Sequence, residues 1–198
     1  MQQLEERILD AAYRLICCWG FKKFTVDDVA GELRISKKTI YKYFKGKREM
    51  INAVVRRETE AESLHIDEIM NSDLSWWGKL AEIMGTKHLK CTPKWVFDEL
   101  EKSVPDAMKL MLDTQKKKQE SAHLLMLEGR REGALRDEIN LVIFEKAMKA
   151  SIEALIEPDF LTQNGLTFKE IIEQVGRLFF FGILKDNELR SSEHEIER

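Results

Sequence analysis

The chain has 198 residues, of which 34% are charged and 43% hydrophobic, and its formal net charge is -3 at pH 7. Only three prolines and ten glycines interrupt long stretches in which apolar residues recur with the 3.6-residue period of helices. This composition predicts a soluble, all-α protein. No segment approaches the roughly 18 consecutive apolar residues of a membrane-spanning helix, and no apolar signal region opens the chain. We therefore expect a cytoplasmic protein.

The cysteines and histidines do not predict a metal or cofactor site. Cys17, Cys18 and Cys91 form neither an even disulfide framework nor a CxxC pair, so we expect buried thiols. The four histidines include no pair at zinc-ligand spacing on one helix. No cofactor is expected.

The first predicted helix runs from Leu4 to Trp19 and ends at Gly20. Its apolar residues repeat as one buried stripe. Thr25 then has the features of an N-cap, and Asp28 three residues later makes the pattern close to a capping box. The second helix is predicted over Val26–Leu33.

A third, short helix follows after the tight connection at Arg34 and Ile35. Ser36 is a good N-cap, and residues 37–44 can form about two turns before Gly46 closes them. Ile40 and Phe44, four residues apart, can anchor one face in a core. The other face is cationic, hydroxyl-bearing and aromatic.

Basic residues are concentrated around this third helix. Residues 34–48 carry seven Lys and Arg and no Asp or Glu, and residues 1–50 hold 11 basic against 7 acidic residues. The remainder holds 21 basic against 28 acidic residues, so a polyanion is expected to bind at the N-terminal end only. Lys and Tyr suit phosphate oxygens, while Lys37 and Thr39 can reach base edges. A merely solvated basic face is the alternative reading.

The residues Thr25–Ala30, followed by Ile35–Phe44 and Lys47, resemble the DNA-binding domain of TetR-family transcriptional regulators. The resemblance covers about the first 50 residues and implies a helix-turn-helix domain over residues 1–48. Arg34 departs from the family, whose turn usually carries glycine, and Lys38 stands where a small residue is common. The residues that the stretch and its resemblance assign to DNA contact are Thr25, Arg34, Ser36, Lys37, Lys38, Thr39, Tyr41, Lys42, Tyr43 and Lys47.

Residues 47–70 are predicted to form a connecting helix, with Lys47 at its start contacting phosphate by resemblance. Helices are then expected over 74–89, from Thr92-Pro93, and from about 103 to 132. Aromatic and thioether side chains are concentrated here, as in a roomy apolar cavity, although an ordinary core contains the same residues. The predicted pocket residues are Trp76, Trp77, Met84, Trp95, Phe97, Met108, Met111 and Met126.

Asp137 is predicted to cap a helix over 138–156 that Pro158 stops. Thr167 and Glu170 form a capping box for the last helix, over 168–185. That helix is apolar on two sides, and TetR-like proteins dimerise through their last two long helices. The predicted dimer interface consists of Ile172, Val175, Gly176, Phe179, Phe180 and Ile183. A charged tail over 186–198 is expected to be disordered.

Together these patterns favour a homodimeric regulator, a repressor by the family's usual mode. Residues 49–185 would form a larger helical domain for ligand binding and dimerisation. The protein would bind a palindromic operator and release it when a small apolar or amphipathic effector enters that domain. A constitutive helix-turn-helix DNA-binding protein without an effector is the alternative. No GxSxG, phosphate-binding glycine loop or HExxH motif is present, so we do not expect an enzyme.

Overall fold

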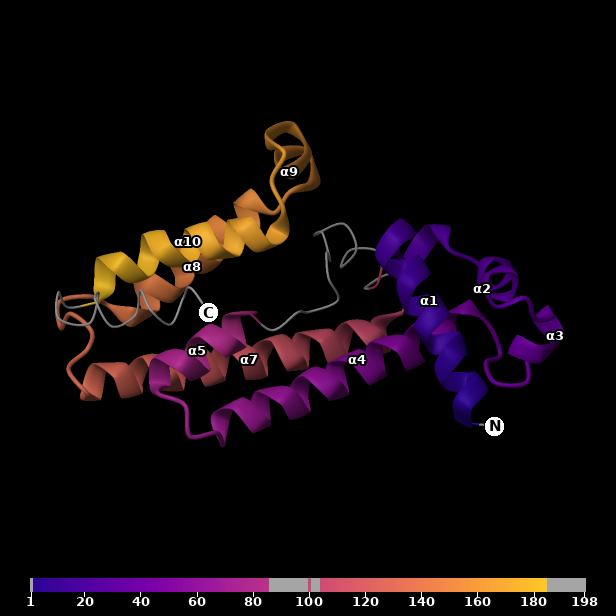
Figure 1. Cartoon of the computed structure of the whole chain (residues 1–198), viewed down its shortest axis with the longest axis horizontal. Coiled ribbons are helices and arrows are strands. Elements are labelled where there is room, and N and C mark those ends of the chain that lie inside the picture. The colour runs from indigo at the N-terminus through magenta and orange to yellow at the C-terminus, as the bar shows by residue number, and fades with distance from the viewer. Residues whose placement is uncertain (1, 86–99, 101–103, 185–198) are drawn as a thin grey trace. The chain divides into compact units, whose positions relative to one another are not determined.

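The computed structural model describes residues 2–85, residue 100 and residues 104–184. These described residues form helices and no β-strand, so the predicted all-α class is confirmed. The helices are α1 (Gln2–Lys23), α2 (Val26–Leu33), α3 (Lys37–Ile40), α4 (Lys47–Met70), α5 (Trp76–Gly85), α7 (Pro105–Arg131), α8 (Leu141–Leu155), α9 (Pro158–Asn164) and α10 (Phe168–Ile183) (Figure 1).

The chain packs as two compact units. The first combines the described residues of Met1–Leu64 and Lys87–Lys116, and the second those of His65–Thr86 and Lys117–Arg198. Helices α4 and α7 therefore each contribute residues to both units.

The first unit is built around one apolar core. Helix α1 contacts α2, and α2 contacts α3. Burying apolar surface is the main favourable contribution to folding, and here α1, α2, α3 and α4 all supply side chains to it. The fully buried members of this core include Ile8, Ala11, Ala12, Phe24, Val29, Ile40, Met50, Val54, Val55, Leu100 and Ala107.

Helix α1 continues beyond its predicted end, with a break at Gly20. This glycine has φ 79° and ψ 169°, which lie outside the helical region and suit a residue without a Cβ. Phe21, just after the break, is buried in the core. Trp19, the last apolar residue of the predicted helix, is 47% exposed and so lies outside the buried stripe.

The cysteines are less buried than predicted. Cys18 is exposed and Cys17 is half-buried, because both lie outside the buried stripe of α1. Cys91 lies outside the described residues.

Helix α3 ends at Ile40, earlier than the predicted end at Phe44. Beyond Ile40 the backbone tightens, and the N–H of Tyr43 donates to the carbonyl of Ile40 at 2.9 Å. This turn places the Phe44 side chain in the core, where it is only 4% exposed. Gly46 does not close this helix; its carbonyl accepts the N–H of Met50 in the first turn of α4.

The predicted bounds of α4 are confirmed, and Leu64 within it is 64% exposed. Helix α5 begins two residues later than predicted, because the hydroxyl of Ser75 accepts the N–H of Gly78 at 3.1 Å. Helix α7 ends before Gly133, whose φ of 77° stops it as predicted. The helix predicted from Thr92 and the charged tail lie outside the described residues.

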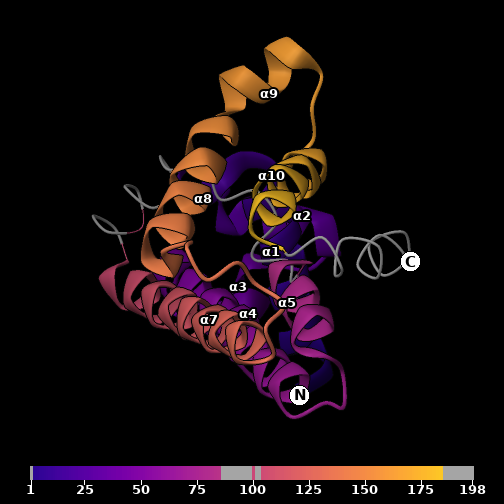
Figure 2. The same cartoon turned by 90° about the vertical axis from the view of Figure 1, so that its left-hand side faces the viewer.

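A chain of aromatic contacts joins three helices of the second unit. Trp76 and Trp77 on α5 meet edge-on, with ring centroids 5.6 Å apart. Trp77 meets Phe180 of α10 at 4.8 Å, and Phe180 meets Phe144 of α8 at 5.5 Å. Phe144 also contacts Phe179 at 5.7 Å. Edge-to-face pairs of this kind stabilise beyond the area they bury, and they hold α8 and α10 side by side (Figures 1 and 2).

The start of α8 differs from the prediction. Asn140, not Asp137, is the N-cap: its side-chain oxygen accepts the N–H groups of Val142 and Ile143 at 3.0 and 3.2 Å. A side chain directly before the first helical residue can reach those donors, whereas Asp137 lies three residues too early.

Beyond α8, Pro158 does more than stop the helix. It is the first residue of α9, a short helix that the sequence analysis missed and that stands away from α8 and α10 (Figures 1 and 2). The predicted capping box of α10 is confirmed, with the Thr167 hydroxyl and Glu170 bonded reciprocally. The hydrogen bond from the hydroxyl and that from the backbone N–H of Thr167 lower the pKa of Glu170 below its ordinary value.

Gly129 on α7 is the position where this packing leaves least room. A Cβ built there would lie 2.7 Å from the Trp76 ring, closer than real Cβ contacts. We expect Gly129→Ala to destabilise the second unit by about 1–3 kcal/mol, because Trp76 must shift to make room. Urea unfolding followed by Trp fluorescence measures this change.

Gly85→Ala is the matched control, because nothing lies within 4 Å of a Cβ at that helical position. It should be neutral or slightly stabilising. Equal effects of the two substitutions would contradict the packing described for Trp76.

Candidate nucleic-acid interface

Helices α2 and α3 begin with side-chain caps that fix the chain on both sides of the turn. The Thr25 hydroxyl accepts the N–H of Asp28, whose carboxylate accepts the N–H and the hydroxyl of Thr25. The Ser36 hydroxyl accepts the N–H of Thr39 at 3.1 Å and lies 2.9 Å from the Thr39 hydroxyl. The caps predicted for both helices are therefore present.

The turn between them is a Schellman motif built on Arg34. Arg34 has φ 55° and ψ 43°, and it is the sole non-glycine residue with positive φ among the described residues. Its N–H donates to Gly31 at 3.2 Å, and the N–H of Ile35 donates to Ala30 at 3.0 Å. These bonds satisfy the last carbonyls of α2, so the strained arginine conformation is tolerated. The other two such helix ends, after α7 and α9, carry glycine.

The turn and α3 present most of the predicted DNA-contacting side chains to solvent. Ile40 is fully buried and holds the short helix against the core. Thr39, Tyr43 and Lys47 are half-buried. The exposed members of the predicted set are Thr25, Arg34, Ser36, Lys37, Lys38, Tyr41 and Lys42.

Two of the lysines predicted to contact DNA also make contacts within the protein. The Lys37 ammonium pairs with Asp27 of α2 at 2.5 Å. The Lys47 ammonium donates to the Lys22 carbonyl at 2.7 Å and lies 4.7 Å from the centre of the Phe24 ring. Lys47 therefore ties the start of α4 to the end of α1, a role that the sequence did not predict. Its contact with phosphate stays a prediction.

The acidic residues near the turn are engaged locally. Asp28 caps α2, Asp27 pairs with Lys37, and Glu32 pairs with Arg14. Glu49 accepts the backbone N–H of Lys45 at 2.5 Å.

The sequence analysis missed two exposed basic residues close to this site, Lys22 and Lys23. Lys22 and Lys23 form the last turn of α1, and Lys22 touches Lys47 through its carbonyl. Lys45, just before α4, and Arg48, in its first turn, belong to the basic stretch over residues 34–48 and are also exposed. A run of two lysines at a helix end was the signal that could have identified the first pair.

The predicted pocket residues do not all join one cluster. Trp76, Trp77 and Met126 are buried in the core of the second unit, and Met84 packs against it. The two methionines predicted on the first half of α7, Met108 and Met111, pack against the core of the first unit. The remaining two, Trp95 and Phe97, lie outside the described residues.

In the core of the second unit, one buried polar atom has no hydrogen-bond partner among the described residues. The indole N–H of Trp77 is buried, and no acceptor for it exists among the described residues. A separate surface depression of about 410 Å³ opens near the start of α8, with Leu127, Arg130 and Leu141 in its wall. His123 also lines it and lies 2.7 Å from the Glu145 carboxylate.

Three of the six predicted dimer residues are buried and three are half-buried. Val175, Phe180 and Ile183 are at most 5% exposed in the single chain, and their assignment to a dimer interface stays a prediction. The others, Ile172, Gly176 and Phe179, are half-buried. The exposed apolar residues of this unit's last long helices are Val142 and Ile143 on α8 and Leu178 and Phe181 on α10.

No group of three His, Cys, Asp or Glu side chains among the described residues is arranged to hold a metal ion. In the described part of the chain, no helix is long and apolar enough to cross a membrane.

The arrangement of α1, α2 and α3 defines a helix-turn-helix DNA-binding domain. Residues 8–54 match the family model of bacterial regulatory proteins, tetR family. The uncharacterized HTH-type transcriptional regulator YvaF of Bacillus subtilis (strain 168) is 29% identical over 189 residues, which cover 93% of this chain and 98% of YvaF. These matches confirm the predicted resemblance to TetR-family transcriptional regulators.

Solved structures share the fold over nearly the whole chain. A transcriptional regulator from Saccharomonospora viridis in complex with choline has a TM-score of 0.73 at 19% identity, covering 93% of this chain and all of that one. A TetR-family regulator from Agrobacterium tumefaciens has a TM-score of 0.74 at 14% identity, covering 93% and 99%. The larger helical part after the DNA-binding domain is thus also a known architecture.

The strained turn generates a prediction. Arg34→Gly should stabilise the first unit by about 0.5–1 kcal/mol, because glycine adopts the left-handed conformation without a Cβ clash. Arg34→Ala removes the same charge but keeps the clash, so it should give no such gain. Urea unfolding of both variants tests this, and an equal gain for alanine would show that charge, not backbone strain, is responsible.

Proposed function

We propose that this protein is a repressor that binds a palindromic operator as a homodimer and is released by a small apolar or amphipathic effector. The observation that carries the proposal is the exposed, basic surface of α3 and its turn, supported from below by buried Ile40 and Phe44. We assign residues 1–48 to DNA binding, 49–185 to effector binding and dimerisation, and 186–198 to a charged tail. Such a regulator acts in the cytoplasm and is not an enzyme.

The capped helix supports binding in a major groove. In helix-turn-helix proteins the N-terminal residues of the second helix reach base edges, and flanking cations contact phosphate. Here the exposed residues at the start of α3 are Lys37 and Lys38, while Lys42 and Arg34 flank it. We assign base contacts to Lys37 and Thr39 and phosphate contacts to the flanking residues and Tyr43.

The dimer is supported by exposed apolar side chains on two adjacent helices. Leu178 is 75% exposed on α10, and Val142 and Ile143 are 67% and 68% exposed on α8. Exposed apolar side chains of this size, on two helices that contact each other, support an interaction surface here. A second copy of this chain is the occupant that a two-fold symmetric operator requires.

The effector is supported by the second core. Its buried Trp77 N–H has no acceptor among the described residues, and leaving such a donor unpaired costs about 1–3 kcal/mol. An apolar molecule with one hydrogen-bond acceptor would remove that cost. The choline bound to the similar regulator from Saccharomonospora viridis supports a small amphipathic ligand.

The constitutive DNA-binding protein stays the second candidate. The edge-to-face contacts of Trp76, Trp77 and Phe180 are those of a well-filled core, and this observation favours it. The two candidates differ only in whether a ligand changes DNA affinity.

Leu178→Asp tests the dimer. A charge in the centre of an apolar interface must be desolvated without a partner, so we expect the dimer dissociation constant to rise by about tenfold or more. Sedimentation over a concentration series measures it. Leu124→Asp is the matched control, because Leu124 on α7 is also exposed, at 56%; an effect confined to Leu124, or absent from Leu178, would contradict the assigned surface.

Reciprocal titration tests the effector. Hydrophobic and cationic amphipathic compounds are screened by Trp fluorescence, and each hit is titrated with and without the DNA that the protein retains from its own genome. A coupled effector should bind about 5- to 150-fold more weakly when DNA is present, because coupling between two sites is mutual. Hits indifferent to DNA would refute the switch, and a broad screen without hits would favour the constitutive protein.

A further inference from the structure

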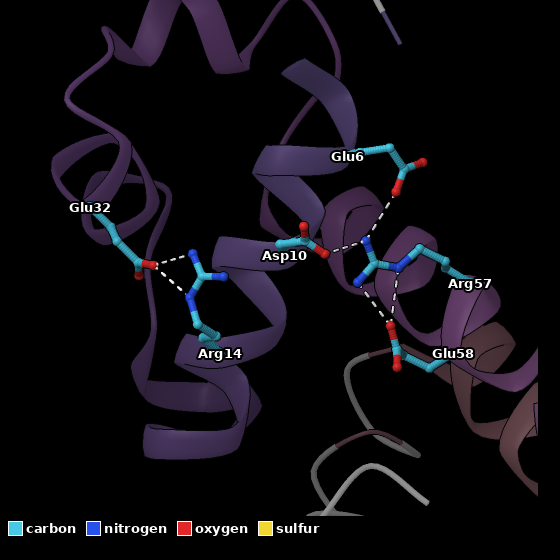
Figure 3. Close-up of polar contacts among 6 residues, drawn as sticks. All are labelled: Glu6, Asp10, Arg14, Glu32, Arg57 and Glu58. Atoms are coloured by element: carbon cyan, nitrogen blue, oxygen red, sulfur yellow. Dashed lines mark hydrogen bonds and ion pairs between the residues drawn. The ribbon is translucent and has the colours of Figure 1, made fainter. Parts of the chain in front are cut away.

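A guanidinium on α4 holds α1 in place. Arg57 donates through Nη1 to Asp10 at 2.8 Å and to Glu6 at 3.2 Å, both on α1 (Figure 3). Its Nε and Nη2 donate to Glu58 at 3.0 and 2.8 Å. Asp10 and Glu6 are four residues apart, so one guanidinium spans a full turn of α1.

A second ion pair connects α1 to α2. Arg14 is one turn beyond Asp10, and its Nε and Nη2 donate to Glu32 of α2 at 2.9 and 2.6 Å (Figure 3). From α2, Asp27 pairs with Lys37 of α3 at 2.5 Å. Ion pairs therefore connect α4, α1, α2 and α3 in series, and each lies within the first unit.

These pairs add little to stability compared with the core beneath them. The α1 residues Ala11 and Ala12 and the α4 residues Val54 and Val55 belong to the same buried core, and burial of this core holds the helices together. Exposed ion pairs typically contribute only about 0.2–1 kcal/mol each. Apolar contacts alone do not fix the orientation of one helix relative to another. A planar guanidinium bonded to several carboxylates does, because its hydrogen bonds are directional.

The Arg57 side chain is held firmly enough to act in this way. It is only 26% exposed, and several contacts share the cost of ordering one side chain. Partial burial by itself lowers the pKa of Arg57, but its hydrogen bonds to Glu58, Asp10 and Glu6 raise that pKa by more, so the guanidinium stays charged.

We infer that Arg57 is a positioning residue that fixes the orientation of α1, and through it of α3, relative to α4, and so sets the half-site spacing that the dimer accepts. The inference rests on the proposed DNA-binding function. Helix α4 contributes residues to both units, so the direction in which it holds α1 determines where each copy of α3 is presented. Inserting one base pair moves a half-site by about 3.4 Å and rotates it, so spacing reports this orientation directly.

The test uses the full-length protein and DNA duplexes that the wild type selects from a random library. Duplexes are remade with the spacer between half-sites shortened or lengthened by one and two base pairs. For wild type we expect affinity to fall about tenfold or more at a two-base-pair change, since deforming DNA or protein to fit is costly. Arg57→Met should reduce that preference to about threefold or less, because the directional hydrogen bonds from α4 to α1 are then lost.

Arg56→Met is the matched control. Arg56 is the neighbouring residue, it is exposed, and its substitution removes the same charge from the same helix. It should keep the wild-type spacing preference. A double variant, Glu6→Gln with Asp10→Asn, removes the acceptors on α1 and should flatten the spacing preference as Arg57→Met does.

A uniform loss of affinity at all spacings in Arg57→Met would assign the residue to stability alone and overturn the inference, as would an unchanged profile. Failure of both Arg57→Met and the double variant to fold would overturn it in the same way. If the wild type selects no duplex at all, the proposed DNA-binding function itself fails, which is a separate and recognisable outcome.

Discussion

Helix α3 depends on burial of the side chains at its end. A helix of four residues is far too short to form alone, because isolated helices shorter than about 12 residues are marginal in water. Ile40 and Phe44 supply what is missing, since both are buried in the core that α1, α2 and α4 build. The polar residues between and around them are then held toward solvent, where we propose that they contact DNA.

The same constraint explains the arginine in the turn. Once Ile40 and the α2 core residue Val29 are both buried, the chain between the helices has little freedom, and Arg34 must adopt the left-handed conformation. The Schellman hydrogen bonds offset part of the strain. An exposed cation at this position is also well suited to a phosphate, which gives a reason for arginine where glycine would cost less.

Local signals in the sequence predicted part of this structure well. The capping boxes of Thr25 and Thr167 and the bounds of α2 and α4 depend on neighbouring residues, and all are confirmed. The end of α3, the cap of α8 and the partner of Lys47 depend on residues distant in the chain or on competing caps, and these were missed. Periodicity showed that α10 is apolar on two sides, but it could not show which side packs on Phe144 and which is left exposed.

The second unit poses a different problem for sequence reasoning. Trp76 and Met111 look alike as candidate pocket residues, yet they pack in different clusters, because α7 extends from one unit into the other. Composition identified the right kind of side chains but not their grouping. The effector proposal therefore rests on the buried Trp77 N–H more than on the number of aromatic residues.

The central claim is that α3 contacts base edges in the DNA major groove while the apolar core of the first unit holds it in position. Dimethyl sulfate protection of the DNA fragments that the protein retains from its genome tests it most directly, because this reagent methylates guanine N7 in the major groove and adenine N3 in the minor groove. The account predicts two protected groups of guanine N7 atoms about one helical turn, or a multiple of it, apart. Protection confined to adenine N3, or uniform binding with no protected guanine, would contradict it.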